Sequence, residues 1–520
     1  MIAGKLLRGL AVAVLVAAGL ASQVQARDLR VNINADPEMI DPVTFSALIA
    51  GDVLRNVYQN FTRVDETGKV LPALALALKW TASPDNLRWR FELRPNVKFH
   101  TGRPFGAKDV KASFEALLTP GSKAGLQLQY LQRIVGAKEV QDGKTKELAG
   151  VKVVGPLVVE VNFNAPDVVF PVYPFMFFDT QAVADNGPNW FMQVSAGTGP
   201  FKFAEWKRGQ SVYLSAFKDY YEGAPKIDGI RFIIVPSEET SVTMYEAGEL
   251  DVLMVASTDL ARRIMRDAKL KAEAQTVSAA QINYLGMNQN LYAPFKDKRV
   301  REAFCISIDR DAMSKGLFGG LAQPLYGQIT PGIPGYNAAV KKIAYDPERA
   351  KKLMADAGYP NGRGMPPLKI ANLAPFRNEI AYFADQWKQV LGVSVDLDIQ
   401  ERATFLRSLN AGETPFFSWG WTADYPDALY FLSQVWHSKS PFNRARYSNP
   451  GFDALIDRAT ITPDNATRYK QYAAAETVLL DDWGTCGLYV RTSVAVVKPN
   501  VKGVVLAPMR MLPYGKVTIS

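Results

Sequence analysis

Short runs of strand-like residues recur along the chain and alternate with longer segments of helical periodicity. Residues 29–33 alternate between apolar and polar side chains, and residues 89–93 place their charged side chains on one solvated face. Residues 151–163 contain β-rich runs turned at Gly155-Pro156, and residues 230–235 are nearly all apolar, as in a strand buried on both faces. This alternation of strands and helices predicts an α/β fold.

Three helices are predicted from their ends as well as from their apolar faces. Asp346 can cap a helix whose first position suits Pro347, and Gly358 can close its far end. A second helix is expected to begin at Asn449-Pro450 and a third near Asp297. Their apolar faces consist of Ala350, Leu353, Met354 and Ala357; of Phe452, Leu455, Ile456 and Ala459; and of Val300, Ala303, Phe304 and Ile308. We interpret all three faces as core packing.

Residues 1–26 have the pattern of a secretory signal. Lys5 and Arg8 precede an apolar run over residues 10–20, and Val24-Gln25-Ala26 supplies a cleavage site. An uncleaved membrane anchor is the alternative, but the run is shorter than the roughly 20 residues of a membrane span. No cysteine lies near the proposed cut. We therefore expect an exported mature chain that starts at Arg27 and carries no lipid anchor, as in a Gram-negative periplasm.

Length and charge narrow the class of protein. A chain of 520 residues suggests about three domains, at roughly 150 residues per domain. With 48% hydrophobic and 21% charged residues, it resembles a soluble globular protein rather than a rod or a polytopic membrane protein. Loss of the signal would lower the net charge from +9 to +7, and no run of five basic residues occurs. We therefore expect no nucleic-acid partner.

Residues suited to catalysis or metal binding are sparse. The two histidines, His100 and His437, stand in unrelated contexts, and no Gly-x-Ser-x-Gly, HExxH or acidic calcium loop occurs. We expect no metal site and no cofactor, and an exported hydrolase is a weak alternative. Cys305 and Cys486 are interpreted as two separate buried thiols, although export would permit a disulfide.

Aromatic residues are concentrated in residues 416–436, where eight occur. Alternation places Phe417, Trp419 and Trp421 on one face of an extended strand. A core strand is one interpretation of this pattern. A ligand site is the other, because the strand gives way to a polar turn with Asp424 and Asp427, and ligand clefts combine aromatic walls with a few polar groups.

Several segments, in this order, resemble the periplasmic solute-binding proteins of peptide-type ABC transporters, the dipeptide- and oligopeptide-binding family (extracellular solute-binding family 5). The matching segments are residues 41–42, 56–61, 68–75, 79–83, 93–110, 197–201, 284–288, 299–303, 308–310 and 355–359. Each motif is weak alone, but their order and spacing behind a signal segment make the resemblance specific.

The resemblance implies an α/β, two-lobed binding-protein fold that closes on its ligand and carries an extra inserted domain. Lobe one would comprise residues 27–50, 195–280 and 490–520. The extra domain would comprise residues 51–194, and lobe two residues 281–489. The implied protein is a periplasmic monomer without enzymatic activity, which passes its ligand to an inner-membrane ABC permease with ATPase subunits.

A small peptide is the first choice of ligand. The same transport role with an opine, a sugar derivative, a glutathione-like compound or a metal or haem complex stays open, although the shortage of histidine disfavours the last two. A signalling or chaperone-like interaction protein of the same fold is a further alternative.

The resemblance also implies a ligand site around residues 419–425. Gly420, Trp421 and Thr422 would pair with the ligand backbone, together with the segment Ser46-Ala47-Leu48, although the oligopeptide binders carry an acidic residue where this chain has Ser46. Trp419 and Tyr425 would flank the site. Asp424 would receive the ligand's α-amino group, whereas Asp427 departs from the motif spacing. The alternative for Asp424 is that it stabilises the turn before Pro426.

Overall fold

The computed structural model describes residues 27–44, 48–65, 69–71 and 75–520. The proposed signal segment 1–26, Ser46 and Ala47 lie outside the described residues. Leu48 is described only as the first residue of helix α1 (Leu48–Leu54). None of the helices in the described ranges is long and apolar enough to cross a membrane.

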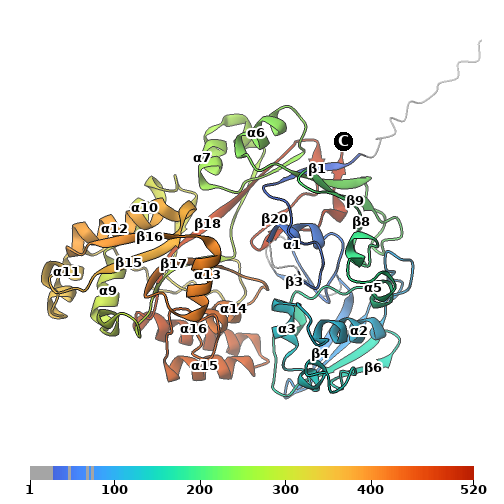
Figure 1. Cartoon of the computed structure of the whole chain (residues 1–520), viewed down its shortest axis with the longest axis horizontal. Coiled ribbons are helices and arrows are strands. Elements are labelled where there is room, and N and C mark those ends of the chain that lie inside the picture. The colour runs from blue at the N-terminus through green and yellow to red at the C-terminus, as the bar shows by residue number, and fades with distance from the viewer. Residues whose placement is uncertain (1–26, 45–47, 66–68, 72–74) are drawn as a thin grey trace, which may run out of the picture.

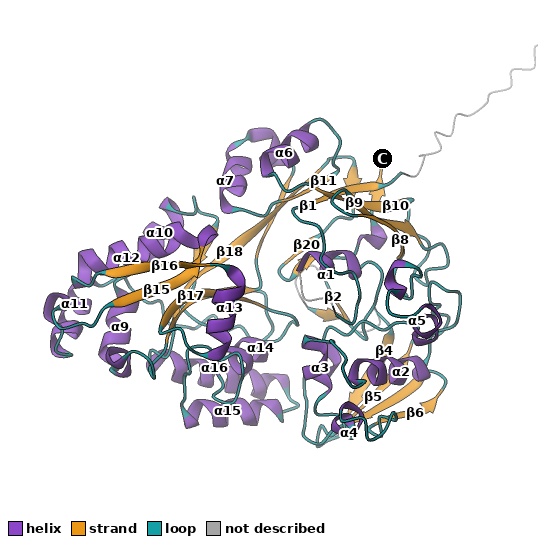
Figure 2. Ribbon diagram, viewed as in Figure 1, coloured by secondary structure: helices purple, strands orange, loops and turns teal. Residues whose placement is uncertain are grey.

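One large sheet connects the two sides of the molecule (Figures 1 and 2). Its strands run in the order β16 (Val395–Gln400), β15 (Leu368–Leu373), β17 (Phe416–Thr422), β13 (Gln281–Met287), β18 (Cys486–Val497), β11 (Val252–Met254), β1 (Leu29–Ile33), β10 (Gly229–Ile234), β9 (Ser211–Ala216) and β8 (Phe201–Lys207). Strands β12 (Ala274–Ser278) and β14 (Ala322–Pro324) also pair with β18. The 12-residue strand β18 therefore links the two lobes, pairing with β13 through its first half and with β12 through its second.

A separate four-stranded sheet, in the order β4-β5-β7-β6, forms the region at the lower right of Figure 1. Its strands are β4 (Ala77–Ala82), β5 (Arg88–Leu93), β6 (Val151–Gly155) and β7 (Val158–Asn162). Helices α2 (Ala107–Leu118), α3 (Leu126–Leu131), α4 (Ala137–Gln141) and α5 (Thr180–Asn186) accompany it. Its core is aromatic: Phe61 stacks on Phe91 with ring centroids 4.1 Å apart, and Phe114 packs against Phe175 at 4.9 Å.

The remaining elements complete the two lobes. Residues 281–489, the expected lobe two, contain α9 (Lys298–Ile306), α10 (Arg310–Gly316), α11 (Pro347–Asp356), α12 (Arg377–Leu391), α13 (Arg402–Ala411), α14 (Leu429–Phe431), α15 (Pro450–Thr460) and α16 (Asn465–Asp481). Helices α6 (Glu238–Glu246), α7 (Thr258–Arg266) and α8 (Ala268–Ala272) fall within residues 195–280, which are expected to belong to lobe one. Two-stranded ribbons are formed by β2 (Arg63–Val64) with β3 (Val70–Leu71), β19 (Val501–Lys502) with β22 (Thr518–Ile519), and β20 (Leu506–Ala507) with β21 (Arg510–Met511).

The predicted helix beginnings are confirmed. The side chain of Asp297 accepts a hydrogen bond from the backbone N–H of Arg299 at 2.9 Å, Asp346 accepts one from Arg349 at 3.0 Å, and Asn449 accepts one from Gly451 at 2.9 Å. Such caps satisfy backbone donors that the first turn of a helix leaves open.

The prediction that residues 230–235 are buried on both faces is wrong. In strand β10, Ile230 and Phe232 are buried, whereas Arg231, Ile233 and Ile234 are partly exposed. The second face stays open to polar contacts, since the Arg231 guanidinium forms an ion pair with Asp28 at 3.2 Å.

The interpretation of Cys305 and Cys486 as separate thiols is also wrong. The two residues form a disulfide, with Cα atoms 5.7 Å apart. Cys305 lies in α9, and Cys486 is the first residue of β18. The disulfide therefore joins this helix to the large sheet. Both residues are fully buried, as predicted. A separation of 181 residues gives no local signal for such a contact.

Candidate functional site

A cavity of about 620 Å³ opens where all three regions of the chain meet. Its lining residues are Ala75, Pro200 and a subset of the residues in the segments 51–65, 124–130, 172–176, 220–222, 422–426 and 503–516. The size falls within the range of pockets that hold small ligands, about 300–1,000 Å³. Residues from widely separated segments therefore converge on one space, as an interlobe ligand site requires.

Asp424 supplies a carboxylate to this cavity, two residues after β17 ends. Its Oδ2 accepts hydrogen bonds from the hydroxyl of Tyr430 at 2.7 Å and from the hydroxyl of Tyr130 at 3.1 Å. Tyr430 belongs to α14 in lobe two, whereas Tyr130 belongs to α3 beside the four-stranded sheet. Burial raises the pKa of Asp424, and the two hydroxyl donors oppose that rise. Neither hydrogen bond goes to the backbone of the turn before Pro426.

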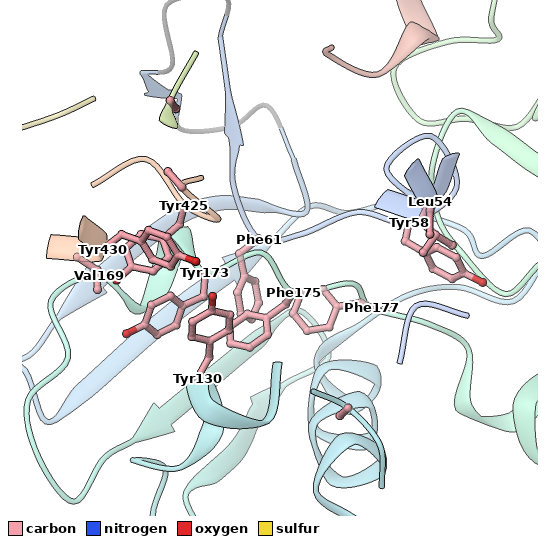
Figure 3. Close-up of a cluster of buried hydrophobic side chains, with 14 of the residues drawn as sticks. Leu54, Tyr58, Phe61, Tyr130, Val169, Tyr173, Phe175, Phe177, Tyr425 and Tyr430 are labelled. Carbon is pink, nitrogen blue, oxygen red and sulfur yellow. The ribbon is translucent and has the colours of Figure 1, made fainter. Parts of the chain in front are cut away.

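Four tyrosines around Asp424 join lobe two to the region of the four-stranded sheet (Figure 3). Tyr130 stacks on Tyr173 with ring centroids 4.4 Å apart, and Tyr425 meets Tyr173 edge-on at 5.1 Å. Tyr425 also contacts Tyr430 at 4.9 Å. These contacts fix the hydroxyl groups that hold Asp424. Sequence reasoning missed Tyr130 and Tyr173, because nothing in their local pattern relates them to residues 424–430.

A polar network forms another wall of the cavity. Arg63 forms an ion pair with Glu222 at 3.2 Å. Gln59 donates hydrogen bonds to the hydroxyls of Tyr220 and Tyr221, both at 2.9 Å, and accepts one from Thr198. Glu222 therefore has a cationic partner, whereas Asp424 is held only by neutral hydroxyls. Among these two carboxylates, Asp424 is the one left to balance a ligand cation.

The end of β17 offers an open strand edge next to Asp424. On one side, residues 416–422 pair in full with β13, where Gly420 lies opposite Asn283. On the other side, β15 pairs with β17 only at Ala371 and Phe417. A β-carbon on Gly420 would lie 2.7 Å from the Gln281 amide nitrogen, so glycine permits the close packing on this strand. Beyond Phe417, no described strand pairs with β17 on the β15 side.

The predicted site residues divide into two groups. Thr422 and Asp424 line the cavity, whereas Trp419, Gly420, Trp421 and Tyr425 lie outside its lining. Phe417, Trp419 and Trp421 share one strand as predicted; Phe417 is in the core and the two tryptophans are partly buried. Ala47 and the side chain of Leu48 are outside the described residues.

Asp427 does not line the cavity, and its carboxylate is bound by other side chains of the protein. Its carboxylate accepts a hydrogen bond from Tyr472 at 2.8 Å and pairs with the buried Arg468 at 3.4 Å. His100 is likewise part of the scaffold, since its ring bonds Ser195 and the carbonyl of Gly199, and burial lowers its pKa to about 3. Within the described ranges, no three His, Cys, Asp or Glu residues are grouped to hold a metal ion.

A comparison with known families identifies the chain. The sequence profile for bacterial extracellular solute-binding proteins, family 5 Middle, matches residues 71–443. This chain is a family 5 extracellular solute-binding protein. The resemblance inferred from its sequence motifs is thereby confirmed.

Curated relatives of this solute-binding protein match over most of their length. Heme-binding protein A of Haemophilus influenzae is 28% identical over 84% of this chain and 82% of that protein. The periplasmic oligopeptide-binding protein OppA of Salmonella typhimurium is 28% identical over 96% of this chain and 94% of its own. Di/tripeptide-binding protein 2 of Pseudomonas aeruginosa is 25% identical over 97% of both chains.

Solved structures establish the fold of the solute-binding protein. HbpA2 from Haemophilus parasuis superposes with a TM-score of 0.80 at 23% identity, covering 95% of this chain and 100% of that one. The Escherichia coli murein tripeptide binding protein MppA gives 0.77 at 24% identity, with 95% and 99% covered. The predicted α/β, two-lobed fold is confirmed.

Proposed function

We propose that this solute-binding protein captures a small peptide in the periplasm and delivers it to an inner-membrane ABC permease with its ATPase subunits. The observation that carries the proposal is Asp424, a partly buried carboxylate without a cationic partner among the described residues, at the mouth of an open strand edge. Relatives named for peptides, including OppA and the di/tripeptide-binding protein, support the same class of ligand.

The chemistry of a free peptide fits this arrangement. Its α-ammonium group must leave water when the lobes close, and a buried cation without a partner is strongly unfavourable. Asp424 would accept charge-assisted hydrogen bonds from that ammonium, which are stronger than neutral ones. The ligand backbone would pair with residues 420–422, where main-chain hydrogen bonds give affinity without selecting side chains. Binding and lobe closure suffice for this function, so no catalytic group is needed.

The proposal includes the lobe boundaries implied by the family resemblance. Residues 27–50, 195–280 and 490–520 would move as lobe one, and residues 281–489 as lobe two, with residues 51–194 as the extra domain. The course of β18 through both halves of the large sheet supports a hinge near its middle.

The central experiment is to purify the exported protein and identify its ligand by mass spectrometry after denaturation. We expect peptides that bear a free amino terminus. Calorimetry with the same peptides, synthesised, should give saturable 1:1 binding, and the peptides should be recovered intact after long incubation. Recovery of an amine-free compound alone would refute peptide capture, and cleavage products would refute a binding-only role.

We expect the protein to remain monomeric with and without ligand. Closure of two lobes within one chain requires no partner subunit, so size-exclusion chromatography should show one monomer peak in both states. Small-angle scattering should show a smaller radius of gyration once peptide is added. A dimer peak at micromolar concentration would contradict this prediction.

Hydrogen exchange tests the proposed backbone pairing. Amide protons on the open edge around residues 420–422 should exchange more slowly with peptide bound, because the ligand strand takes them as hydrogen-bond donors. The segment 46–48 should be protected in the same way. Residues 283–285 of β13, already paired with β17 on one side and β18 on the other, serve as an internal control. Protection confined to other segments would refute this mode of binding.

A further inference from the structure

The Cys305–Cys486 disulfide has a cation beside it that peptide capture does not use. Arg310, the first residue of α10, is only 3% exposed. Its Nη2 donates to the sulfur of Cys486 at 2.8 Å and to the sulfur of Cys305 at 3.1 Å. Both cysteines are fully buried. A charged guanidinium therefore contacts both ends of a buried S–S bond.

The guanidinium of Arg310 uses all of its donors on neutral acceptors. Its Nε donates to the carbonyl of Gly487 at 2.8 Å, and its Nη1 donates to the carbonyls of Cys305 and Ile308 at 3.2 and 3.3 Å. Together with the bonds to the two sulfurs, these use the five N–H groups that an arginine carries. None of the acceptors is charged, so the hydrogen bonds are complete while the positive charge is not balanced.

No carboxylate in the described ranges forms an ion pair with Arg310. Asp311, the acidic residue whose charge acts on Arg310, is exposed and pairs with Lys342 at 3.2 Å. Tyr326 is the other titratable side chain that acts on it. Burial lowers the pKa of Arg310 to about 10, which still leaves the guanidinium protonated at neutral pH. A buried cation without a counter-ion is unfavourable, so this position favours an anion next to Nη2.

Reduction of the disulfide can create that anion. A free cysteine has a pKa of about 8.5, and a neighbouring lysine or arginine lowers it to about 3.5–7.5. Burial acts in the opposite direction, but here the unpaired guanidinium already contacts the sulfur atoms. Cys486 is the better position for a thiolate, because its sulfur is closer to Nη2. Cys305 lies in the last turn of α9, where the negative end of the helix dipole opposes a second anion.

We propose that Cys305 and Cys486 form a reversible redox site, whose reduced form is a thiol at Cys305 and a thiolate at Cys486 held by Arg310. The co-reactant is a dithiol, which gives up two electrons and two protons and becomes a disulfide. As the S–S bond of the protein breaks, one proton binds to Cys305 and the other is released to water. Cys486 keeps its electron pair as the thiolate. This exchange requires no further oxidant or reductant.

The position of the redox site gives it a structural consequence. Reduction would release α9 from the first residue of β18, the strand that links the two lobes. The guanidinium would gain a counter-ion at the same step, so the core keeps its hydrogen bonds to Arg310 in both redox states. The proposal does not depend on which ligand the protein captures.

The number of protons released provides the first test. The full mature protein is equilibrated with mixtures of reduced and oxidised dithiothreitol at pH 6 and pH 7, starting from both redox states. Free thiols are then counted by mass spectrometry after acid quenching, denaturation and alkylation. The equilibrium constant for reduction should rise about tenfold from pH 6 to pH 7, because one proton is released per disulfide reduced. A constant that does not change with pH would mean that both thiols are protonated and would overturn the proposal, as would a folded protein that dithiothreitol does not reduce.

Two single serine variants assign the thiolate to one sulfur. Cys305→Ser leaves only Cys486 beside Arg310, and Cys486→Ser leaves only Cys305, so each variant is the matched control of the other. The ultraviolet absorbance of a thiolate, read against the double serine variant, should appear at pH 7 in Cys305→Ser and be absent in Cys486→Ser. A thiolate in neither variant, or only in Cys486→Ser, would contradict the assignment to Cys486.

Substitutions of Arg310 separate its charge from its packing. Arg310→Lys keeps a cation, so the rise of the equilibrium constant with pH should persist. Arg310→Met removes the cation, and the constant should become independent of pH between pH 6 and pH 7. A pH dependence that Arg310→Met retains in full would show that the arginine does not hold the thiolate. If Arg310→Met folds poorly, the single serine variants decide the question with Arg310 in place.

Discussion

Asp424→Ala is expected to weaken peptide binding by at least about 2 kcal/mol, because truncation leaves the ligand's ammonium buried without its partner. Asp424→Asn is the more informative variant. An asparagine oxygen can still accept hydrogen bonds from Tyr130 and Tyr430, so the local packing persists while the charge is lost. If the charge of Asp424 binds the ligand, calorimetry should show similar losses of peptide affinity for the two variants.

The control variant for this prediction is Glu222→Gln. Glu222 lines the same cavity but is already paired with Arg63, so its loss should change peptide affinity little. With the wild-type protein, acetylating the peptide's amine should weaken binding as much as Asp424→Ala does. With the Asp424→Ala variant, acetylation should cause no further loss of affinity. Equal affinity of wild type and Asp424→Ala would remove this residue from the site and favour an amine-free ligand.

The same carboxylate predicts a pH dependence of binding. Burial raises the pKa of Asp424 above the ordinary aspartate value in the ligand-free protein. The ammonium is bound by the ionised form, so affinity should be full above this raised pKa and fall as the pH drops through it. An aspartate with a raised pKa in the folded state destabilises the fold when ionised. Asp424→Asn should therefore not lower the ligand-free melting temperature at pH 7. The weaker peptide affinity of this variant should no longer fall as the pH drops through the pKa of Asp424.

Replacing both Cys305 and Cys486 by alanine is expected to lower the free energy of unfolding by about 3–5 kcal/mol. The disulfide closes a loop between residues 181 positions apart, and long loops gain the most from a crosslink in the unfolded chain. Chemical denaturation followed by tryptophan fluorescence measures the loss. An alanine variant as stable as the wild type would show that the crosslink contributes little.

Arg310 is expected to increase the loss of unfolding free energy in the double alanine variant. Its buried Nη2 donates to the sulfur of Cys486 at 2.8 Å and to that of Cys305 at 3.1 Å. Alanine at both positions leaves this donor without an acceptor, whereas serine supplies hydroxyl oxygens. The double serine variant should therefore be more stable than the double alanine variant, although neither reaches the wild type. Peptide affinity of either folded variant should match that of the wild type.

Local physical chemistry explains why the secondary structure could be predicted. A capping side chain bonds backbone groups two or three residues away, so Asp297, Asp346 and Asn449 mark helix beginnings in any context. Alternation in a strand likewise depends only on the pleat, and it placed Phe417, Trp419 and Trp421 together on β17. The apolar run at 230–235 led to a wrong prediction of burial on both faces. The composition of a strand does not reveal how far other elements cover each face of β10.

The sequence by itself determined the family, the α/β architecture and Asp424 as the candidate carboxylate, because all three rest on residues close together in the chain or on the order of short motifs. The tertiary structure alone decided what surrounds that carboxylate. Tyr130, 294 positions away, reaches Asp424 only because α3 packs against lobe two, and the Cys305–Cys486 disulfide exists only because α9 packs on β18. Contacts between distant segments arise from the packing of whole lobes, and no local pattern encodes them.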